Sequence, residues 1–286
     1  MSNKTISLVL GSGGARGLAH VGVIRWLEEN GHDIKSISGC SIGSLIGGAY
    51  ATGKLDAVVE WMESFTRKEI YSMLDLSFTW NSLVKGDKMM AAIQSKIGTD
   101  LIEDLPIKFT AVAADIAAEK EHWFQSGPID QAIRASVSLP LFFTPHTVDG
   151  VQLIDGGILN PTPIEPTLAD DTDLTVAVDL GGPMMKEAIP EPEKAQSPWQ
   201  QKMDDFLESM KSSESQPKDQ WDMFYIADQS FNTMQNAIAR GRMADNPPDH
   251  LISVPRNKCG TLEFDRSAEM IEHGYRLAAE QLSGKL

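Results

Sequence analysis

The chain has 286 residues, of which 42% are hydrophobic and 23% are charged, and its formal net charge is −15. This composition excludes a fibrous or largely disordered chain. Because the chain is acidic and has no basic run, we expect no nucleic-acid partner, and contact with a membrane would have to be hydrophobic. The segment before the first glycine is too short and polar for a secretory signal, and there are only two cysteines. We therefore expect a cytoplasmic protein with reduced thiols, with peripheral contact at the inner face of the membrane as a further option.

The beginning of the chain alternates between strand-like and helix-like segments. Residues 6–10 are a continuous apolar run that ends in a glycine-rich loop at 11–17, which predicts a buried strand and a tight turn. Helical spacing over 18–30 is followed by a short strand at 36–40 and by a small-residue helix at 42–52. This order of segments is typical of an α/β fold with a parallel sheet.

The rest of the chain continues the same alternation. Further segments that look like strands lie at 109–113, 151–154, 174–178 and 250–254, and an alternating segment at 121–124 could form a hairpin with the first of them. Helical spacing recurs at 56–98 (with an aromatic-rich interruption at 71–80), 128–136, 199–210, 223–240 and 264–282. Residues 183–198 are rich in proline and charge, so we expect a single domain over 1–286 with a mobile insertion near 182–220.

The pentapeptide Gly39-Cys40-Ser41-Ile42-Gly43 is a G-x-S-x-G placed between a predicted strand and a predicted helix. In this context the pattern is typical of a nucleophile elbow, in which Ser41 sits in a strained turn and the glycines avoid crowding of the backbone. The dipole of the following helix would favour the negative charge that develops in acyl transfer. The alternative is a glycine-rich turn whose serine merely caps the helix. We expect Cys40 to project away from the site as a small buried residue.

The glycine-rich loop at 11–17 suits one of three functions. A P-loop needs Lys followed by Ser or Thr after its last glycine, and here Leu18 and Ala19 follow. A dinucleotide fingerprint fits poorly, because no G-x-G-x-x-G spacing is present. The remaining function is an oxyanion hole, in which unshielded backbone amides receive the charge that develops beside the serine.

A serine hydroxyl also needs a base. We expect His250 and His273 to be surface residues, and His20, next to the glycine loop, could only shape the site. The better candidate is Asp155, which ends a short apolar strand and precedes two glycines, at an edge where catalytic residues of α/β proteins gather. The alternative is that Asp155 and Gly156 form an ordinary turn.

Four motifs in this order resemble the patatin-like phospholipases, most closely their short bacterial single-domain members. They are GSGGARG at 11–17, GCSIG at 39–43, RASVSLPLFFTP at 134–145 and DGG at 155–157. The tail FDRSAEMIEHGYRLAAEQL is also similar to the final helix of that family, so the resemblance covers nearly the whole chain. It implies a three-layer α/β/α fold with a central, mostly parallel sheet.

The resemblance also implies a serine acyl hydrolase with a Ser–Asp dyad. Carried over by position, Ser41 is the nucleophile and Asp155 is the base. The oxyanion hole would be formed by amides of Gly13, Gly14, Ala15 and Arg16. The motif glycines would be Gly11, Gly17, Gly39, Gly43, Gly156 and Gly157. Arg16 could instead brace the loop, through an ion pair, or meet a phosphate. The sequence departs from the family at Ser12, where glycine is more frequent.

We therefore expect an enzyme that cleaves lipid carboxylic esters of the phospholipid or lysophospholipid type through an acyl-enzyme. The alternatives are a thioesterase or short-chain esterase, or a non-catalytic lipid-binding regulatory protein. The segment 61–80 and the helix at 199–210 are candidates for an acyl groove or a lid, and equally for ordinary core helices. No cofactor and no metal are expected, because the acidic run 170–173 lacks spaced further ligands. The oligomeric state cannot be read from the sequence.

Overall fold

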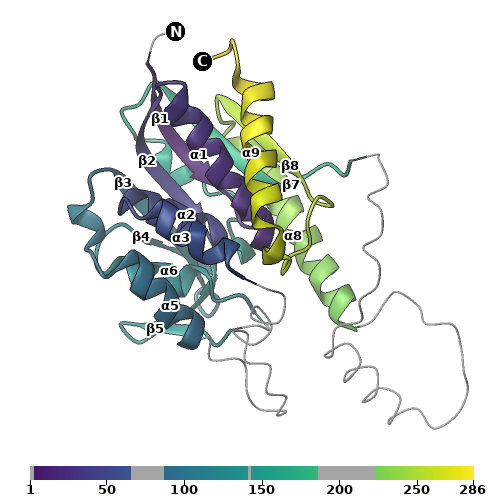
Figure 1. The fold of residues 1–286 in the computed structure, drawn as a ribbon. Helices are drawn as coiled ribbons and strands as arrows, with labels where there is room; N and C mark the ends of the chain where they lie inside the picture. Colours follow the sequence, from purple (N-terminus) through teal and green to yellow (C-terminus); the bar gives the residue numbers. More distant parts are fainter. Residues whose placement is uncertain (1–2, 66–86, 141–142, 186–222) are drawn as a thin grey trace, which may run out of the picture.

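The computed structural model describes residues 3–65, 87–140, 143–185 and 223–286 (Figure 1). Within these ranges an eight-stranded sheet has the order β5-β6-β3-β2-β1-β7-β8, with β4 also paired to β3. The strands are β1 (Thr5–Leu10), β2 (Asp33–Cys40), β3 (Lys108–Asp115), β4 (Lys120–Phe124), β5 (His146–Val148), β6 (Val151–Asp155), β7 (Leu174–Gly182) and β8 (His250–Pro255).

Helices cover the sheet. The α-helices are α1 (Ala19–Glu29), α2 (Ile42–Ala51), α3 (Leu55–Glu63), α5 (Asp87–Ile97), α6 (Ile129–Ser136), α8 (Met223–Asp245) and α9 (Ser267–Leu282). The 3-10 helices are η1 (Gly14–Leu18), η2 (Ile102–Asp104), η3 (Gly156–Ile158), η4 (Glu165–Thr167) and η5 (Phe264–Arg266). No helix in the described ranges has both the length and the apolar character needed to cross a membrane.

The alternation of side chains along β1 separates the two faces of the sheet. Leu8 and Leu10 belong to the large core formed with α1, α2 and α9. Val9 points the other way and joins a smaller cluster with Ile164, against which Met243 of α8 packs. The sheet therefore lies between two helical layers, as the predicted α/β/α fold requires.

Helices α1 and α9 lie side by side over the sheet (Figure 1). A Cβ on Gly22 would lie 2.0 Å from the carbonyl oxygen of Ile271, and a Cβ on Gly274 would lie 2.0 Å from that of Ala19. The two backbones approach this closely because each helix presents a glycine at the crossing. This packing fixes the closing helix, near the other end of the chain, against the first one.

The sheet is mixed. Strands β1, β2, β3, β7 and β8 run parallel, whereas β4, β5 and β6 pair antiparallel with their neighbours. Strand β5 was not predicted, although Asp149 and Gly150, with φ values of 49° and 81°, form a tight hairpin turn before β6. The expected insertion near 182–220 falls largely, and the interruption at 71–80 entirely, outside the described residues.

Candidate active site

Ser41 forms a sharp turn between the end of β2 and the start of α2. Its φ of 55° and ψ of −124° are strained for a residue with a side chain. An ideal Cβ on Gly39 would lie 2.5 Å from the carbonyl oxygen of Gly43, and one on Gly43 would lie 2.0 Å from that of Leu10. The turn therefore needs both glycines, and it holds Ser41 at the N-terminus of α2, where the helix dipole favours negative charge.

Asp155 reaches this turn because two strands end head to head. Val112 of β3 pairs with Cys40, and the next residue, Ala113, pairs with Asp155. Strand β4 occupies the opposite edge of β3 at both positions. The last residues of β2 and β6 therefore lie next to each other on one edge of β3, and Ser41 follows directly. Asp155 thus ends a strand that runs antiparallel to β3, and not one of the parallel strands of the sheet.

Asp155 is fully buried, and burial raises the pKa of its carboxyl to about 6. The Ser41 hydroxyl, the Gly157 amide and the Cys40 thiol each oppose part of this rise in pKa. Oδ1 accepts hydrogen bonds from the Gly157 amide at 2.8 Å and from the Cys40 thiol at 3.8 Å. Oδ2 has no hydrogen-bond partner among the described residues, so Ser41 lies close to this carboxyl without completing a hydrogen bond.

The loop after β1 presents two backbone amides that no described residue uses. Gly13 and Gly14 donate no hydrogen bond there, whereas the Ala15 amide donates to the carbonyl of Thr261 at 2.9 Å. Gly14 has a φ of 58°, and a Cβ at this position would lie 2.3 Å from the same Thr261 oxygen. Since the Ala15 amide is already engaged, Gly13 and Gly14 are the better candidates for an oxyanion hole.

Arg16 and His20 brace the glycine loop from inside. The buried Arg16 guanidinium donates to two backbone carbonyls, one of them that of Gly13 at 3.1 Å, and to the side-chain oxygen of Asn232 on α8 at 2.9 Å. Its hydrogen-bond partners in this part of the chain are neutral oxygen atoms and not the expected ion pair. His20 Nε2 donates to the Gly11 carbonyl at 2.9 Å, and burial lowers the pKa of its imidazole to about 4.

Ser12, the departure from the family pattern, ties the same loop to α8. Its Oγ accepts a hydrogen bond from Gln235 of α8 at 3.3 Å, and its amide donates to the Pro161 carbonyl at 2.7 Å. Together with the contact between Arg16 and Asn232, this ties the glycine loop to α8 at two points.

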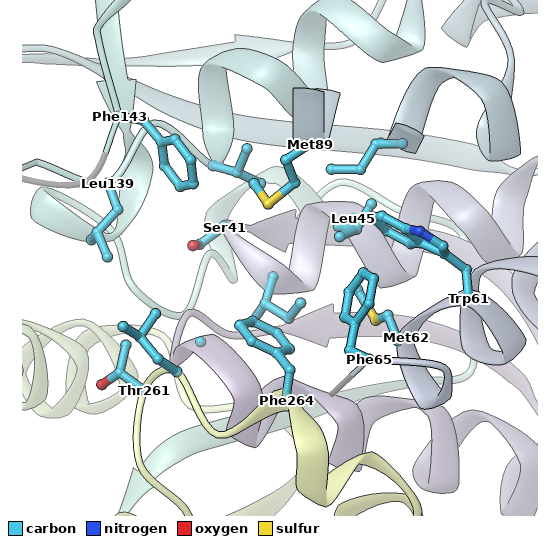
Figure 2. Close-up of a pocket in the computed structure, with 15 residues that line it drawn as sticks. Ser41, Leu45, Trp61, Met62, Phe65, Met89, Leu139, Phe143, Thr261 and Phe264 are labelled. Carbon is cyan, nitrogen blue, oxygen red and sulfur yellow. The ribbon is translucent and has the colours of Figure 1, made fainter. Parts of the chain in front are cut away.

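Ser41 opens into an apolar pocket of about 810 Å³, its open mouth included (Figure 2). Besides Gly14, Ser41 and Thr261, the lining residues are hydrophobic. They come from α2, α3, α5 and residues 262–264, together with Phe65, Val137, Leu139 and Phe143. In Figure 2 the Ser41 hydroxyl faces Leu139 and Phe143, and Trp61 lies at the opposite end. No charged side chain lines the described part of this pocket, which therefore suits a hydrocarbon chain.

Two residues are placed differently from the sequence prediction. Cys40 contacts Asp155 because β2 ends beside β6, so its thiol does not point away from the site. His273 is buried, because it lies on the inner face of α9, and its Nδ1 accepts a hydrogen bond from Arg276.

Of the segment 61–80 only its first part is described, and Trp61 and Phe65 there line the pocket. The helix expected at 199–210 lies outside the described residues.

Ser136 and Ser138 are functional candidates that the sequence reasoning missed. The Ser41 amide donates to Ser136 Oγ at 2.9 Å, and that hydroxyl donates in turn to the Val112 carbonyl at 2.6 Å. The Asp155 amide donates to the Ser138 carbonyl at 3.0 Å. The last residue of α6 and the segment that follows it therefore hold the backbones of Ser41 and Asp155. This segment belongs to the family-like motif at 134–145, but no local sequence pattern reveals these contacts.

No group of three His, Cys, Asp or Glu side chains in the described ranges could hold a metal ion. The acidic run at 170–173 is not simply solvated, since Asp170 pairs with Lys108 and accepts a hydrogen bond from Ser7 at 2.9 Å. These contacts account for the Asp170 carboxylate as part of the fold.

The sequence profile described as Patatin-like phospholipase matches residues 8–168, a range that includes the glycine loop, Ser41 and Asp155. This chain belongs to the patatin-like phospholipase family. A protein named as an NTE family member from Mycobacterium tuberculosis (strain ATCC 25618 / H37Rv) is 35% identical over 331 residues, which cover 98% of this chain and 92% of the relative. Lysophospholipase NTE1 from Pyricularia oryzae is 28% identical over 288 residues, which cover 99% of this chain and 19% of that protein.

Among solved structures, VipD from Legionella pneumophila is similar with a TM-score of 0.47 and 15% identity, over 98% of this chain and 66% of that chain. Membership of the patatin-like phospholipase family, together with lysophospholipase relatives, supports hydrolysis of lipid esters by this chain. Helices α8 and α9 lie beyond the matched range of the family. The contacts between the glycine loop and α8 therefore join the part of the chain that the family profile matches to a segment beyond it.

Proposed function

We propose that this chain hydrolyses carboxylic esters of lipids, of the phospholipid or lysophospholipid type, with Ser41 as the nucleophile and Asp155 as its base. The main support is the position of Ser41, whose hydroxyl opens into an apolar pocket beside a buried carboxyl with one free oxygen. An acyl chain in that pocket would gain about 0.8 kcal/mol for each methylene it buries. The uncharged lining suits the acyl chain, and a charged headgroup would stay outside the pocket.

The reaction would proceed in two acyl-transfer steps. Ser41 Oγ attacks the ester carbonyl carbon while Asp155 accepts the hydroxyl proton. The oxyanion that forms accepts hydrogen bonds from the amides of Gly13 and Gly14. The intermediate collapses to an acyl-serine, and the departing alcohol takes the proton from Asp155. Water then attacks the acyl-serine while Asp155 accepts its proton. The second intermediate collapses to the fatty acid, and Asp155 returns the proton to the departing Ser41 Oγ. One oxyanion-hole donor is typically worth about 10²–10³ in rate.

Aspartate is ordinarily a weak base for an alcohol, because its pKa is 3.8. Burial raises the pKa of the Asp155 carboxyl to about 6, which narrows the difference between its pKa and that of the serine hydroxyl. The helix dipole at Ser41 and the free amides would supply the remaining stabilisation of negative charge. A single carboxylate can therefore serve as the base without a histidine.

Labelling with a fluorophosphonate probe tests the nucleophile. We expect wild-type protein to be labelled and to release fatty acid from a panel of p-nitrophenyl esters, phospholipids and lysophospholipids. Ser41→Ala should abolish both, and Asp155→Asn should abolish turnover. Ser38→Ala is a matched control, because Ser38 lies on β2 shortly before Ser41, is buried, and its hydroxyl has no described hydrogen-bond partner.

Two results would overturn the proposal. Retained labelling and turnover in Ser41→Ala would remove the nucleophile, and activity only towards thioesters or short esters would replace lipid esters as the substrate.

Contact with a membrane surface belongs to the same proposal, since the substrates reside there. Co-sedimentation of Ser41→Ala protein with phosphatidylcholine vesicles tests it.

A further inference from the structure

Cys40 and Asp155 form a direct contact inside the sheet. Both side chains are fully buried, and the Cys40 thiol donates to Asp155 Oδ1 at 3.8 Å. The same oxygen accepts the Gly157 amide at 2.8 Å. Oδ2 has no partner in the described part of the chain. The two oxygens of one carboxylate therefore have different roles, since one is held at two points and the other is free.

The thiol is a hydrogen-bond donor here and not a second nucleophile. Burial and the neighbouring Asp155 raise the pKa of the Cys40 thiol well above its usual value, so it stays protonated. Cys40 is also not among the residues that line the acyl pocket. A buried thiol that meets a carboxylate, but not the substrate, can act only through that carboxylate.

We infer that Cys40 is a positioning residue for the proposed base: with the Gly157 amide, its thiol fixes Oδ1 of Asp155 and so turns Oδ2 to receive the proton of Ser41. Two donors on one oxygen set the rotation of the carboxylate plane, which a single donor would leave free. The inference rests on the proposed function, because it assigns a task to Oδ2 in the attack of Ser41.

Few ionisable groups face this pair from the elements packed against it. Strand β2 contributes Cys40 itself, and Glu121 of β4 acts on the thiol electrostatically. The other groups that influence the pKa of Asp155 are the Ser41 hydroxyl of the turn before α2 and the Gly157 amide of η3, and both are uncharged. The side chain that α8 brings to Gly157 is the neutral Gln235. A change in the titration of Asp155 after substitution of Cys40 is therefore attributable to the lost thiol.

Three substitutions separate the hydrogen bond from the packing. Cys40→Ala removes the donor and leaves a cavity, Cys40→Val removes the donor but fills the space, and Cys40→Ser keeps a donor. We measure kcat and KM with a soluble p-nitrophenyl ester across the pH range, and thermal unfolding for each variant. Cys259→Ala is the control for loss of a buried thiol, since Cys259 lies near the carbonyls of Gly260 and Glu263 and does not contact Asp155.

The thiol holds the pKa of Asp155 down, so its removal should move the acid limb of kcat/KM to higher pH. We expect a shift of about half a pH unit in both the Ala and the Val variant, with kcat several-fold lower and KM unchanged. Cys40→Ser should titrate closer to wild type, and Cys259→Ala should titrate as wild type.

The inference is overturned if the Ala and Val variants titrate as wild type, or if Val restores the kcat lost in Ala without any shift of the limb. The second result would assign Cys40 to packing alone. Failure of the proposed function looks different, because Ser41→Ala would then retain turnover. An inactive Ser41→Ala combined with an unshifted limb in both Cys40 variants refutes only the role of Cys40.

Discussion

Cys40 and Asp155 pair with consecutive residues of β3 although they lie 115 positions apart in the chain. This register brings the carboxyl ends of β2 and β6 together, and it places Ser41 beside Asp155. The proposed dyad therefore depends on the pairing of two strands with a third and not on a local motif.

The first prediction concerns the pH dependence of wild-type activity. Because Asp155 must be ionised to accept a proton, kcat/KM should fall as the pH drops through about 6, and not near the ordinary aspartate pKa of 3.8. Release of fatty acid measured across the pH range checks this. An acid limb near the ordinary aspartate value would contradict the role of burial in raising the pKa.

The second prediction concerns stability. The pKa of about 6 in the folded state exceeds the ordinary 3.8, so the folded protein binds this proton more tightly than the unfolded chain does. The contribution of this carboxyl to stability is full below about pH 4 and is lost as the pH rises through about 6. Asp155→Asn should therefore raise the free energy of unfolding by up to about 3 kcal/mol above that pH, with no comparable gain in acid.

Urea unfolding at one pH below about 4 and at one above about 6 measures this effect. Asp149→Asn is the control, because this residue lies at the exposed turn before β6 and tolerates a positive φ as asparagine. An equal change in stability at the two pH values would show that the substitution acts through packing and not through the charge of Asp155.

The third prediction concerns Ser136. Ser136→Ala removes the acceptor of the Ser41 amide and the donor to the Val112 carbonyl, so the strained turn loses its support. We expect kcat to fall by about 10–100-fold with little change in KM, because Ser136 does not line the pocket. Ser95→Ala serves as the control, since that exposed hydroxyl bonds only within α5. A change in KM alone would be inconsistent with a role in positioning.

The fourth prediction concerns Gly14. A methyl group at this position would collide with the Thr261 carbonyl oxygen and would also be strained by the positive φ, so Gly14→Ala should displace the proposed oxyanion-hole amides. We expect about a 10²-fold loss of kcat or more. Gly150→Ala is the matched control, because Gly150 has a φ of 81° but open space around it. Equal losses in the two variants would exclude a specific role for Gly14.

The fifth prediction concerns acyl-chain length. The Trp61 and Phe65 rings pack edge to face at 4.7 Å, and Trp61 lies at the end of the pocket away from Leu139 (Figure 2). Trp61→Ala should open this end, so that the ratio of kcat/KM for long over short esters rises about ten-fold. The exposed Trp123 outside the pocket provides the control substitution, Trp123→Ala. An unchanged preference would mean that acyl chains do not reach Trp61.

Much of the fold could be predicted locally. The apolar runs of β1 and β7, the proline before α6 and the helical spacing of α9 each act over a few residues, and the structure has these elements close to the predicted positions. Strand β5 was missed because it has only three residues and half-exposed side chains, so its pattern is weak. The direction of β6 was also outside the reach of the sequence pattern, since a short apolar run reads the same in a parallel and an antiparallel pair.

The candidate site also combines features that the sequence predicts with features that it does not. Ser41 and the glycine loop could be named from the sequence because the strained turn and the bare amides require glycine at fixed spacings. The hydrogen bond from the Ala15 amide to the Thr261 carbonyl could not be predicted, because Thr261 lies near the other end of the chain. The contact of Cys40 with Asp155 reverses the prediction that this thiol points away, since alternation along β2 says nothing about a strand that meets its end.

By itself, the sequence determined most of the strands and helices and the position of the glycine-flanked turn at Ser41, because backbone conformation and apolar periodicity act over neighbouring residues. Only the tertiary structure decided which carboxyl oxygen stays free, which amides remain open and which serines hold the turn. Those properties depend on hydrogen bonds and burial among residues that are distant in the chain, and the pairing of β3 with both β2 and β6 creates them.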